Sequence, residues 1–123
     1  MSKIIIVEDD PMLSEIYQMT FSGAGFEVFL AENGKTALDV IKKENVDVVL
    51  SDLIMPEMDG FELIKILRGG EYDPKIKIII TSNLSDEDNH KKAIELGANG
   101  FIIKSNCTPS QLVEEAKKII AAV

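Results

Sequence analysis

The sequence predicts an α/β fold of the (βα)5 type, in which one doubly wound, five-stranded parallel sheet carries helices on both faces. Three observations predict it. Short apolar runs alternate five times with longer segments of helical character along the 123 residues. The runs are nearly continuous in valine, isoleucine and leucine, which is typical of strands covered on both faces. Capping residues precede the helical segments, and glycines follow several of them.

The apolar runs give the strands. The first reads KIIIV and the fourth IKIIIT, and their many β-branched residues favour central positions in a sheet. The third, VDVVLS, is followed directly by the carboxylate of Asp52. The expected strands are residues 3–7, 27–31, 46–51, 76–81 and 100–103.

Capping signals locate the helices. Asp10 and Pro11 offer a cap and a first-turn proline to the first helix, and Asp59 offers a cap to the third. Ser85 begins a capping-box pattern for the fourth helix, and Thr108 does so for the fifth. The expected helices are residues 12–22, 35–44 and 61–68, the segment between Ser85 and Gly97, and the segment after Thr108.

This alternation predicts which strand ends lie together. Right-handed crossovers place helices on both faces of the sheet, and the common order for five strands is 2-1-3-4-5, as in flavodoxin-like folds. In that order the switch point lies between strands 1 and 3, where ligands bind beyond the carboxyl ends of the strands. Strand 1 is followed by Glu8, Asp9 and Asp10, and strand 3 by Asp52. Several carboxylates therefore meet at one crevice.

Such a cluster needs a partner. Two like charges ~4 Å apart cost about 4 kcal/mol at an effective dielectric near 20, so a lysine, a cation or protonation must resolve them. Strand 4 ends at Thr81 and strand 5 near Lys104, which adds a hydroxyl and an ammonium to the same edge. Carboxylates with room for water suit Mg²⁺, which commonly also binds phosphate oxygens. The arrangement predicts a site for a phosphoryl group.

Composition excludes several other classes of function. The net charge of −8 argues against direct nucleic-acid binding, which needs a basic surface. No apolar run approaches the ~18 residues of a membrane span, and the first residues do not resemble a signal peptide. Cys107 has no second cysteine with which to pair. We therefore expect a cytoplasmic protein that contacts neither nucleic acid nor membrane.

With these residues identified, the chain resembles a response-regulator receiver domain of two-component signalling, and residues 1–123 are expected to form that single domain. Positions at four separate strand ends carry the resemblance, in the order typical of the family. They are Glu8-Asp9, Asp52 with Met55-Pro56-Glu57-Met58-Asp59-Gly60, Thr81-Ser82, Phe101 and Lys104.

The resemblance implies a role for each acid. Asp52 would be the phosphoacceptor, taking a phosphoryl group from a phosphohistidine of a sensor histidine kinase or histidine phosphotransfer protein. Asp9, Asp52 and the backbone carbonyl of Ile54 would bind Mg²⁺ directly, and Glu8 would bind it through water. Lys104 would hold a phosphoryl oxygen. The domain would catalyse only its own phosphorylation and dephosphorylation, so it is not expected to be an enzyme in the usual sense.

The resemblance also implies a switch. The hydroxyl of Thr81 would bond to the attached phosphoryl group, and Phe101 would then rotate inward and change the surface of the fourth helix, fifth strand and fifth helix. Output would pass to an unknown downstream partner or a missing effector domain. Acidic residues around strand 5 often accompany dimers of this family, and Asn99 and Gly100 stand there, so a monomer or weak dimer is expected.

Two alternatives remain. A Mg²⁺-dependent phosphatase of the haloacid-dehalogenase type also forms an aspartyl-phosphate, but it expects Asp-x-Asp, which Asp52-Leu53-Ile54 does not supply. A pseudo-receiver would bind partners without taking phosphate. The family usually has proline after the strand-5 lysine, and Ser105 stands there instead, which leaves the shape of this loop open. His90 is expected on the surface, away from the strand ends.

Overall fold

A computed structural model describes residues 2–83 and 87–122 of the chain and shows five parallel strands that alternate with five α-helices. The strands have the order β2-β1-β3-β4-β5, so the predicted fold class and strand order are confirmed. The elements are β1 (Lys3–Val7), α1 (Pro11–Gly23), β2 (Glu27–Ala31), α2 (Gly34–Glu44), β3 (Val48–Asp52), α3 (Gly60–Leu67), β4 (Lys77–Ser82), α4 (Glu87–Leu96), β5 (Gly100–Ile103), the 3-10 turn η1 (Lys104–Asn106) and α5 (Pro109–Ala121).

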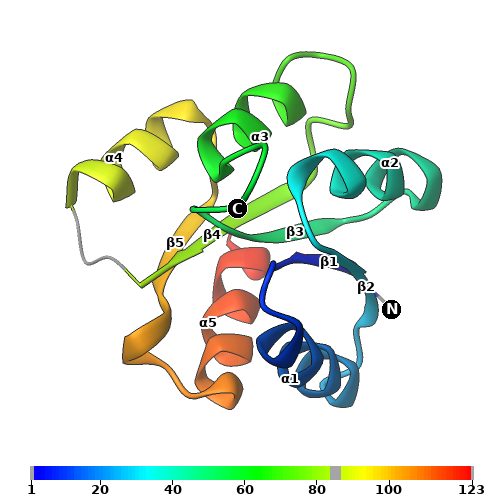
Figure 1. Cartoon of the computed structure of the whole chain (residues 1–123), viewed down its shortest axis with the longest axis vertical. Helices are drawn as coiled ribbons and strands as arrows, with labels where there is room; N and C mark the ends of the chain where they lie inside the picture. The colour runs from blue at the N-terminus through cyan, green and yellow to red at the C-terminus, as the bar shows by residue number, and fades with distance from the viewer. Residues whose placement is uncertain (1, 84–86, 123) are drawn as a thin grey trace.

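The sheet separates two helical layers. Helices α1 and α5 lie below the sheet in Figure 1, and α2, α3 and α4 lie above it. Alternate residues of each strand face opposite layers, so Ile4 and Ile6 pack with α1 and α5, whereas Ile5 and Val7 pack with the other three helices. Both layers are apolar and buried, which explains the nearly continuous hydrophobic runs.

The expected strand bounds are correct at three strands and shifted at two. Strand β3 begins at Val48 and includes Asp52, and β4 runs from Lys77 to Ser82. The shift arises because pairing, and not hydrophobicity, sets the ends: Asp52 lies opposite Thr81 in the β3–β4 register. The nucleophile candidate is therefore held by the sheet itself and does not start the following loop.

The predicted caps are present where the structure describes them. The side chain of Asp10 accepts the backbone N–H groups of Met12 and Leu13, and Asp59 caps α3. Thr108 forms a complete capping box at α5. The predicted capping box at Ser85 lies outside the described residues. Within the described part of the chain, no helix is long and apolar enough to cross a membrane.

The loop after β5 is the 3-10 turn η1, and every described peptide bond, including Lys104-Ser105, is trans. The turn begins at Lys104, so its ammonium is held at the end of β5 next to the ends of β1 and β3.

Candidate functional site

The carboxyl ends of β1, β3, β4 and β5 bring the predicted site residues to one edge of the sheet. Glu8 follows β1 directly, Asp52 ends β3, and Lys104 follows β5. Thr81 pairs with Asp52 across the β3–β4 ladder. The structure thus brings together side chains that are up to 96 residues apart in the sequence.

Lys104 binds two carboxylates at this edge. Its Nζ lies 2.6 Å from Oε1 of Glu8 and 3.1 Å from Oδ2 of Asp52. The side chains of Lys104, Glu8 and Asp52 are 7%, 4% and 16% exposed, so little water screens these charges. The ammonium of Lys104 therefore offsets part of the repulsion between the carboxylates of Glu8 and Asp52.

Burial and charge shift the pKa values in this group. Burial raises the pKa of Glu8, and its hydrogen bond to Lys104 offsets only part of that rise. Burial works to lower the pKa of Lys104, but the hydrogen bond to Glu8 and the charge of Asp52 outweigh it, so the pKa of Lys104 is raised. The lysine is firmly charged, whereas Glu8 is the acid of the group that protonates more readily than a free glutamate.

The acidic cluster of Glu8, Asp9 and Asp52 fits a hard divalent cation. One carboxylate oxygen from each residue lies within 4.8 Å of the others. Oxygen donors on an open edge, with Asp9 exposed to water, match the preference of Mg²⁺ for a few carboxylates and several waters. Ile54 lies in the loop that follows, and its side chain is 65% exposed. Its carbonyl as a ligand stays a prediction.

Thr81 lies beneath this cluster with its side chain buried. It is 3% exposed, and its hydroxyl donates to the carbonyl of Ser51 at 3.4 Å. That distance is long for a hydroxyl donor, for which about 2.7–2.8 Å is usual, so the bond is weak and easily exchanged for a better one.

The loop between β3 and α3 is anchored by backbone groups. The N–H of Leu53 donates to Thr81 at 2.9 Å, and the N–H of Gly60 donates to Leu53 at 2.7 Å. A Cβ on Gly60 would lie 3.0 Å from Cα of Leu53 and 3.1 Å from the carbonyl of Asp52, which leaves no room for a side chain. The glycine of the MPEMDG motif is therefore needed for the close approach of α3 to the end of β3.

His90 is exposed, as expected, but it is not isolated. Its ring stacks on Phe101 with the ring centroids 5.1 Å apart and the planes 10° apart. Phe101 is half-buried and packs against the upper core. This contact could not be predicted from the sequence, because it joins α4 to β5 and no local pattern encodes it.

Arg68 was also missed. It lies at the end of α3, and its guanidinium donates to the carbonyls of Gly97 and Pro74 and to Oδ1 of Asn99 at 3.0–3.1 Å. A basic residue in the last turn of a helix is common, so the sequence gives no signal that Arg68 joins the end of α3 to the α4–β5 turn.

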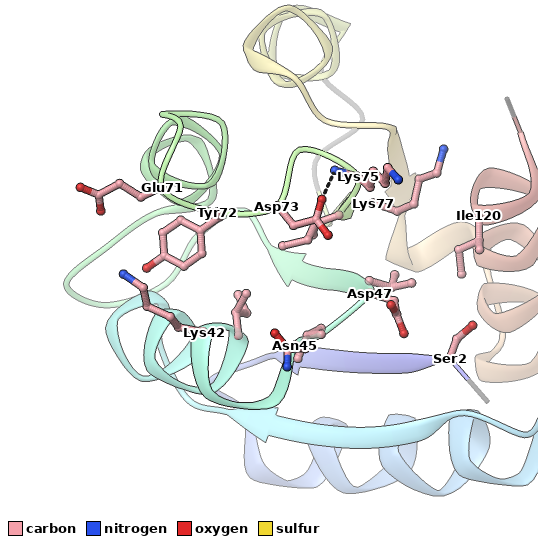
Figure 2. A pocket seen from close by; sticks show the side chains of 14 residues that line it. Ser2, Lys42, Asn45, Asp47, Glu71, Tyr72, Asp73, Lys75, Lys77 and Ile120 are labelled. Atoms are coloured by element: carbon pink, nitrogen blue, oxygen red, sulfur yellow. Dashed lines mark hydrogen bonds between the residues drawn. The ribbon is translucent and has the colours of Figure 1, made fainter.

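A hollow of about 740 Å³ lies at the opposite edge of the sheet, beside the start of β3 (Figure 2). Some of its polar groups already have partners within the protein. Asp73 accepts the N–H of Lys75 at 2.9 Å, Asp47 accepts the first amide of β1 at 2.8 Å, and the ammonium of Lys42 lies 5.3 Å from the ring centroid of Tyr72. Among the described residues, the hollow has no cluster of carboxylates with a lysine like that of Glu8, Asp52 and Lys104, so the edge with the acidic cluster is the better candidate.

Comparisons with known proteins show the family to which the chain belongs. A family model described as "Response regulator receiver domain" matches residues 4–117. The chain is 34% identical over 118 residues to the chemotaxis protein CheY of Thermotoga maritima, which is 95% of this chain and 96% of that protein. It is also similar to the solved structure of the chemotaxis response regulator CheY4 of Vibrio cholerae, with a TM-score of 0.89 and 28% identity over 97% of this chain and 98% of that one.

Other relatives are longer. The chain spans about half the length of two probable transcriptional regulators, ycf27 of Porphyridium aerugineum and ycf29 of Pyropia yezoensis, and is 30% identical to each. It covers 49% of the first and 53% of the second. The shared part is thus a unit that occurs both in short proteins and within longer ones.

Proposed function

The chain belongs to the response regulator receiver domain family, and from that premise we propose that residues 1–123 act as one phosphorylatable switch with Asp52 as the phosphoacceptor. The observation that carries this proposal is the position of Lys104. Its ammonium lies 3.1 Å from the carboxylate of Asp52, at an edge where Glu8 and Asp9 also lie. A carboxylate beside an ammonium and a cation site is suited to hold a phosphoryl group.

The transfer makes one bond and breaks one. A carboxylate oxygen of Asp52 attacks the phosphorus of a phosphohistidine, and the phosphorus–nitrogen bond breaks as the imidazole leaves with the electron pair and takes up a proton from solvent. The product is an acyl phosphate on Asp52 and a neutral histidine. Lys104 donates N–H groups to a phosphoryl oxygen, and its partial burial strengthens that attraction.

The acidic cluster would hold Mg²⁺ through Asp9, Asp52 and the carbonyl of Ile54, with Glu8 acting through water. When bound, the metal supplies positive charge that offsets the negative charge of the transferring oxygens. Glu8 has a second task, because its hydrogen bond to Lys104 keeps the ammonium aimed at this edge.

Thr81 and Phe101 carry the signal outward. The weak bond from Thr81 to Ser51 exchanges for a stronger one to a phosphoryl oxygen. This draws the end of β4 toward Asp52, and Phe101 moves inward from its stack on His90. The surface of α4, β5 and α5 then changes, and a downstream partner or an effector domain reads it.

Receiver domains of response regulators are phosphorylated by histidine kinases, and we assign the phosphodonor of this chain to that class, either a sensor kinase or a histidine phosphotransfer protein. We place the domain in the cytoplasm as a monomer or weak dimer, with Mg²⁺ as its cofactor. Its catalysis is limited to its own phosphorylation and dephosphorylation.

The test is incubation with acetyl phosphate, or with beryllium fluoride as a mimic, with and without Mg²⁺. We expect a mass gain of one phosphoryl group that needs Mg²⁺, and none in Asp52→Asn. Asp10→Asn is the matched control, because it removes one carboxylate from the same edge and an asparagine still caps α1.

The same experiment separates the alternatives. An adduct that persists in Asp52→Asn, or no Mg²⁺-dependent change at all, would refute the switch. If the well-folded protein forms no adduct, it is a pseudo-receiver. If it turns over a phosphate ester in large excess over protein, it is a phosphatase.

A further inference from the structure

Strand β3 carries a polar side chain into the buried layer above the sheet. Ser51 has 0% of its surface exposed, and Asp52 follows it directly. Because side chains alternate along a strand, Ser51 faces the same layer as Val49, which packs in the core beneath α2, α3 and α4. Burial of a hydroxyl costs free energy unless the group is hydrogen-bonded, so the partners of Ser51 show what its hydroxyl holds.

The hydroxyl of Ser51 contacts two groups that lie further along the chain. Its Oγ donates to the carbonyl of Asp52 at 2.9 Å and lies 3.7 Å from Sδ of Met55. A serine hydroxyl has one hydrogen, so the two acceptors share it, and the thioether sulfur is the weaker acceptor. Met55 is only 8% exposed, so little water competes for this contact. The hydroxyl thus joins the end of β3 to the loop that follows.

Ile54 lies between these two partners and is held only through its neighbours. Its side chain is 65% exposed, and within the part of the chain that the structure describes no hydrogen bond to its backbone is found. On one side, Leu53 is fixed by two backbone hydrogen bonds of 2.9 and 2.7 Å. On the other side, Met55 is fixed by its buried side chain and by the contact with Ser51. The position of the carbonyl of Ile54 therefore depends on both neighbours.

The loop beyond Met55 contains a strained turn. Glu57 has a φ of 69°, and the N–H of Met58 donates to the carbonyl of Pro56 at 2.8 Å. A γ-turn with a positive φ at its centre is rare and strained, and it persists only where its surroundings fix it. Met58 packs so closely on α2 that a Cβ on Gly34 would lie 2.6 Å from its Sδ. The buried contacts of the two methionines therefore hold this turn from both sides.

We propose that Ser51 is a positioning residue for the metal site at this edge of the sheet. By holding the carbonyl of Asp52 and the sulfur of Met55, its hydroxyl fixes the backbone of Ile54 in the position from which its carbonyl would bind Mg²⁺. This rests on the function proposed above, because it takes the acidic cluster to be a site for Mg²⁺. A fixed carbonyl favours Mg²⁺ over Ca²⁺, since Mg²⁺ needs near-ideal octahedral geometry at about 2.0–2.1 Å and Ca²⁺ accepts irregular sites at about 2.3–2.6 Å.

The first test compares the wild type and Ser51→Ala in titrations with Mg²⁺ and with Ca²⁺. The unphosphorylated proteins are used, and the backbone amide signals of Asp52, Ile54 and Met55 report binding. We expect Ser51→Ala to bind Mg²⁺ about fivefold more weakly, which corresponds to the loss of one hydrogen bond. Its affinity for Ca²⁺ should change less than about twofold, because Ca²⁺ tolerates a displaced carbonyl.

Val49→Ala is the matched control, because Val49 is fully buried on the same face of β3 and has no polar group to hold the loop. It should lower the urea midpoint of unfolding more than Ser51→Ala does, yet leave the ratio of Mg²⁺ to Ca²⁺ affinity unchanged. An unchanged ratio in Ser51→Ala, or an equal change in Val49→Ala, would overturn this proposal alone. A wild type without any Mg²⁺-dependent shift at this edge would overturn the proposed function as well, so the two failures can be told apart.

The second test needs no metal. Relaxation of the backbone amide nitrogens gives the order parameters of the metal-free proteins, which fall where the backbone gains motion on the picosecond to nanosecond scale. We expect lower order parameters at Ile54 and Met55 in Ser51→Ala than in the wild type, and no such change in Val49→Ala. Equal order parameters in Ser51→Ala and the wild type would show that the hydroxyl does not hold the loop, and this would overturn the proposal.

Discussion

At the scale of single residues, the resting site has three carboxylates and one ammonium. The acidic cluster carries three negative charges when ionised, and Lys104 supplies one positive charge within reach of two of them. The surplus of negative charge is what a divalent cation would neutralise. Because of the same surplus, the charge of Asp52 should lower the free energy of unfolding when no cation is bound.

Replacing Asp52 by asparagine should therefore raise the free energy of unfolding in the absence of Mg²⁺ by about 1 kcal/mol. Lys104 keeps its 2.6 Å bond to Glu8, while the repulsion between Asp52 and its two acidic neighbours disappears. Urea denaturation at neutral pH without divalent ions measures this. A less stable Asp52→Asn protein would mean that the attraction of Lys104 for Asp52 exceeds the repulsion.

Tyr17 reports the electrostatics of the buried layer below the site. It is 6% exposed, and burial raises its pKa above the ordinary value of 10.0. The charge of Lys104 lowers this pKa by less than burial raises it, and the charges of Glu8 and Asp52 add smaller raising effects. Above pH 10 the unfolded chain loses this proton before the folded chain does. Stability should therefore fall as the pH rises through the pKa of folded Tyr17.

Tyr17→Phe removes this contribution, so its free energy of unfolding should fall less than that of the wild type from about pH 9 to about pH 11. Urea denaturation across that range measures the difference. Tyr72→Phe is the control, because Tyr72 is only half-buried and should follow the wild type. Parallel curves for wild type and Tyr17→Phe would contradict the assignment.

Among the helices and strands, the sequence predicts those bounds that depend on local features such as apolar runs and capping residues. Strand periodicity and caps located β1, β2 and β5 correctly, because these runs end where polar or glycine residues begin. Strand β3 ends at Asp52, one residue beyond the apolar run, since pairing between Asp52 and Thr81 extends it. The roles of Arg68 and His90 could not be predicted, because both bind partners on other elements.

Helix α3 begins at Gly60, where its backbone lies close to the end of β3. The variant Gly60→Ala tests whether this close approach stabilises the fold. The added Cβ would meet backbone atoms of Leu53 and Asp52 at 3.0–3.1 Å, and backbone cannot rotate away as a side chain can. We expect a loss of about 1–3 kcal/mol in the free energy of unfolding, measured with urea.

Gly23→Ala is the control for that variant. Gly23 ends α1, and a Cβ there has nothing within 4 Å, so the substitution should be neutral or stabilise by up to about 1 kcal/mol. If both variants lost the same stability, the loss at Gly60 could not be ascribed to the close approach of the backbone.

At the scale of the whole molecule, α4 is held unequally at its two ends. The guanidinium of Arg68 donates to the carbonyl of Gly97 just beyond the C-terminal end of α4. A Cβ on Gly97 would lie 2.8 Å from Arg68, so this end fits tightly. Near the other end, the stack of His90 on Phe101 joins α4 to β5. A switch that moves Phe101 must break the second contact, whereas it can leave the first intact.

The stack should therefore contribute to the free-energy difference between the resting and the switched form of the domain. The variant His90→Ala tests this contribution. Aromatic pairs contribute about 0.5–1.5 kcal/mol beyond their buried area, and an exposed histidine belongs at the lower end. Since the stack stabilises the resting form, its loss should raise the apparent affinity for beryllium fluoride with Mg²⁺ about two- to fivefold. A titration followed by amide signals of β5 measures the affinity. His90→Phe is the control, because it retains an aromatic ring on Phe101 and should bind beryllium fluoride as the wild type does. If His90→Ala bound beryllium fluoride more weakly than the wild type, or equally well, the stack would not oppose switching.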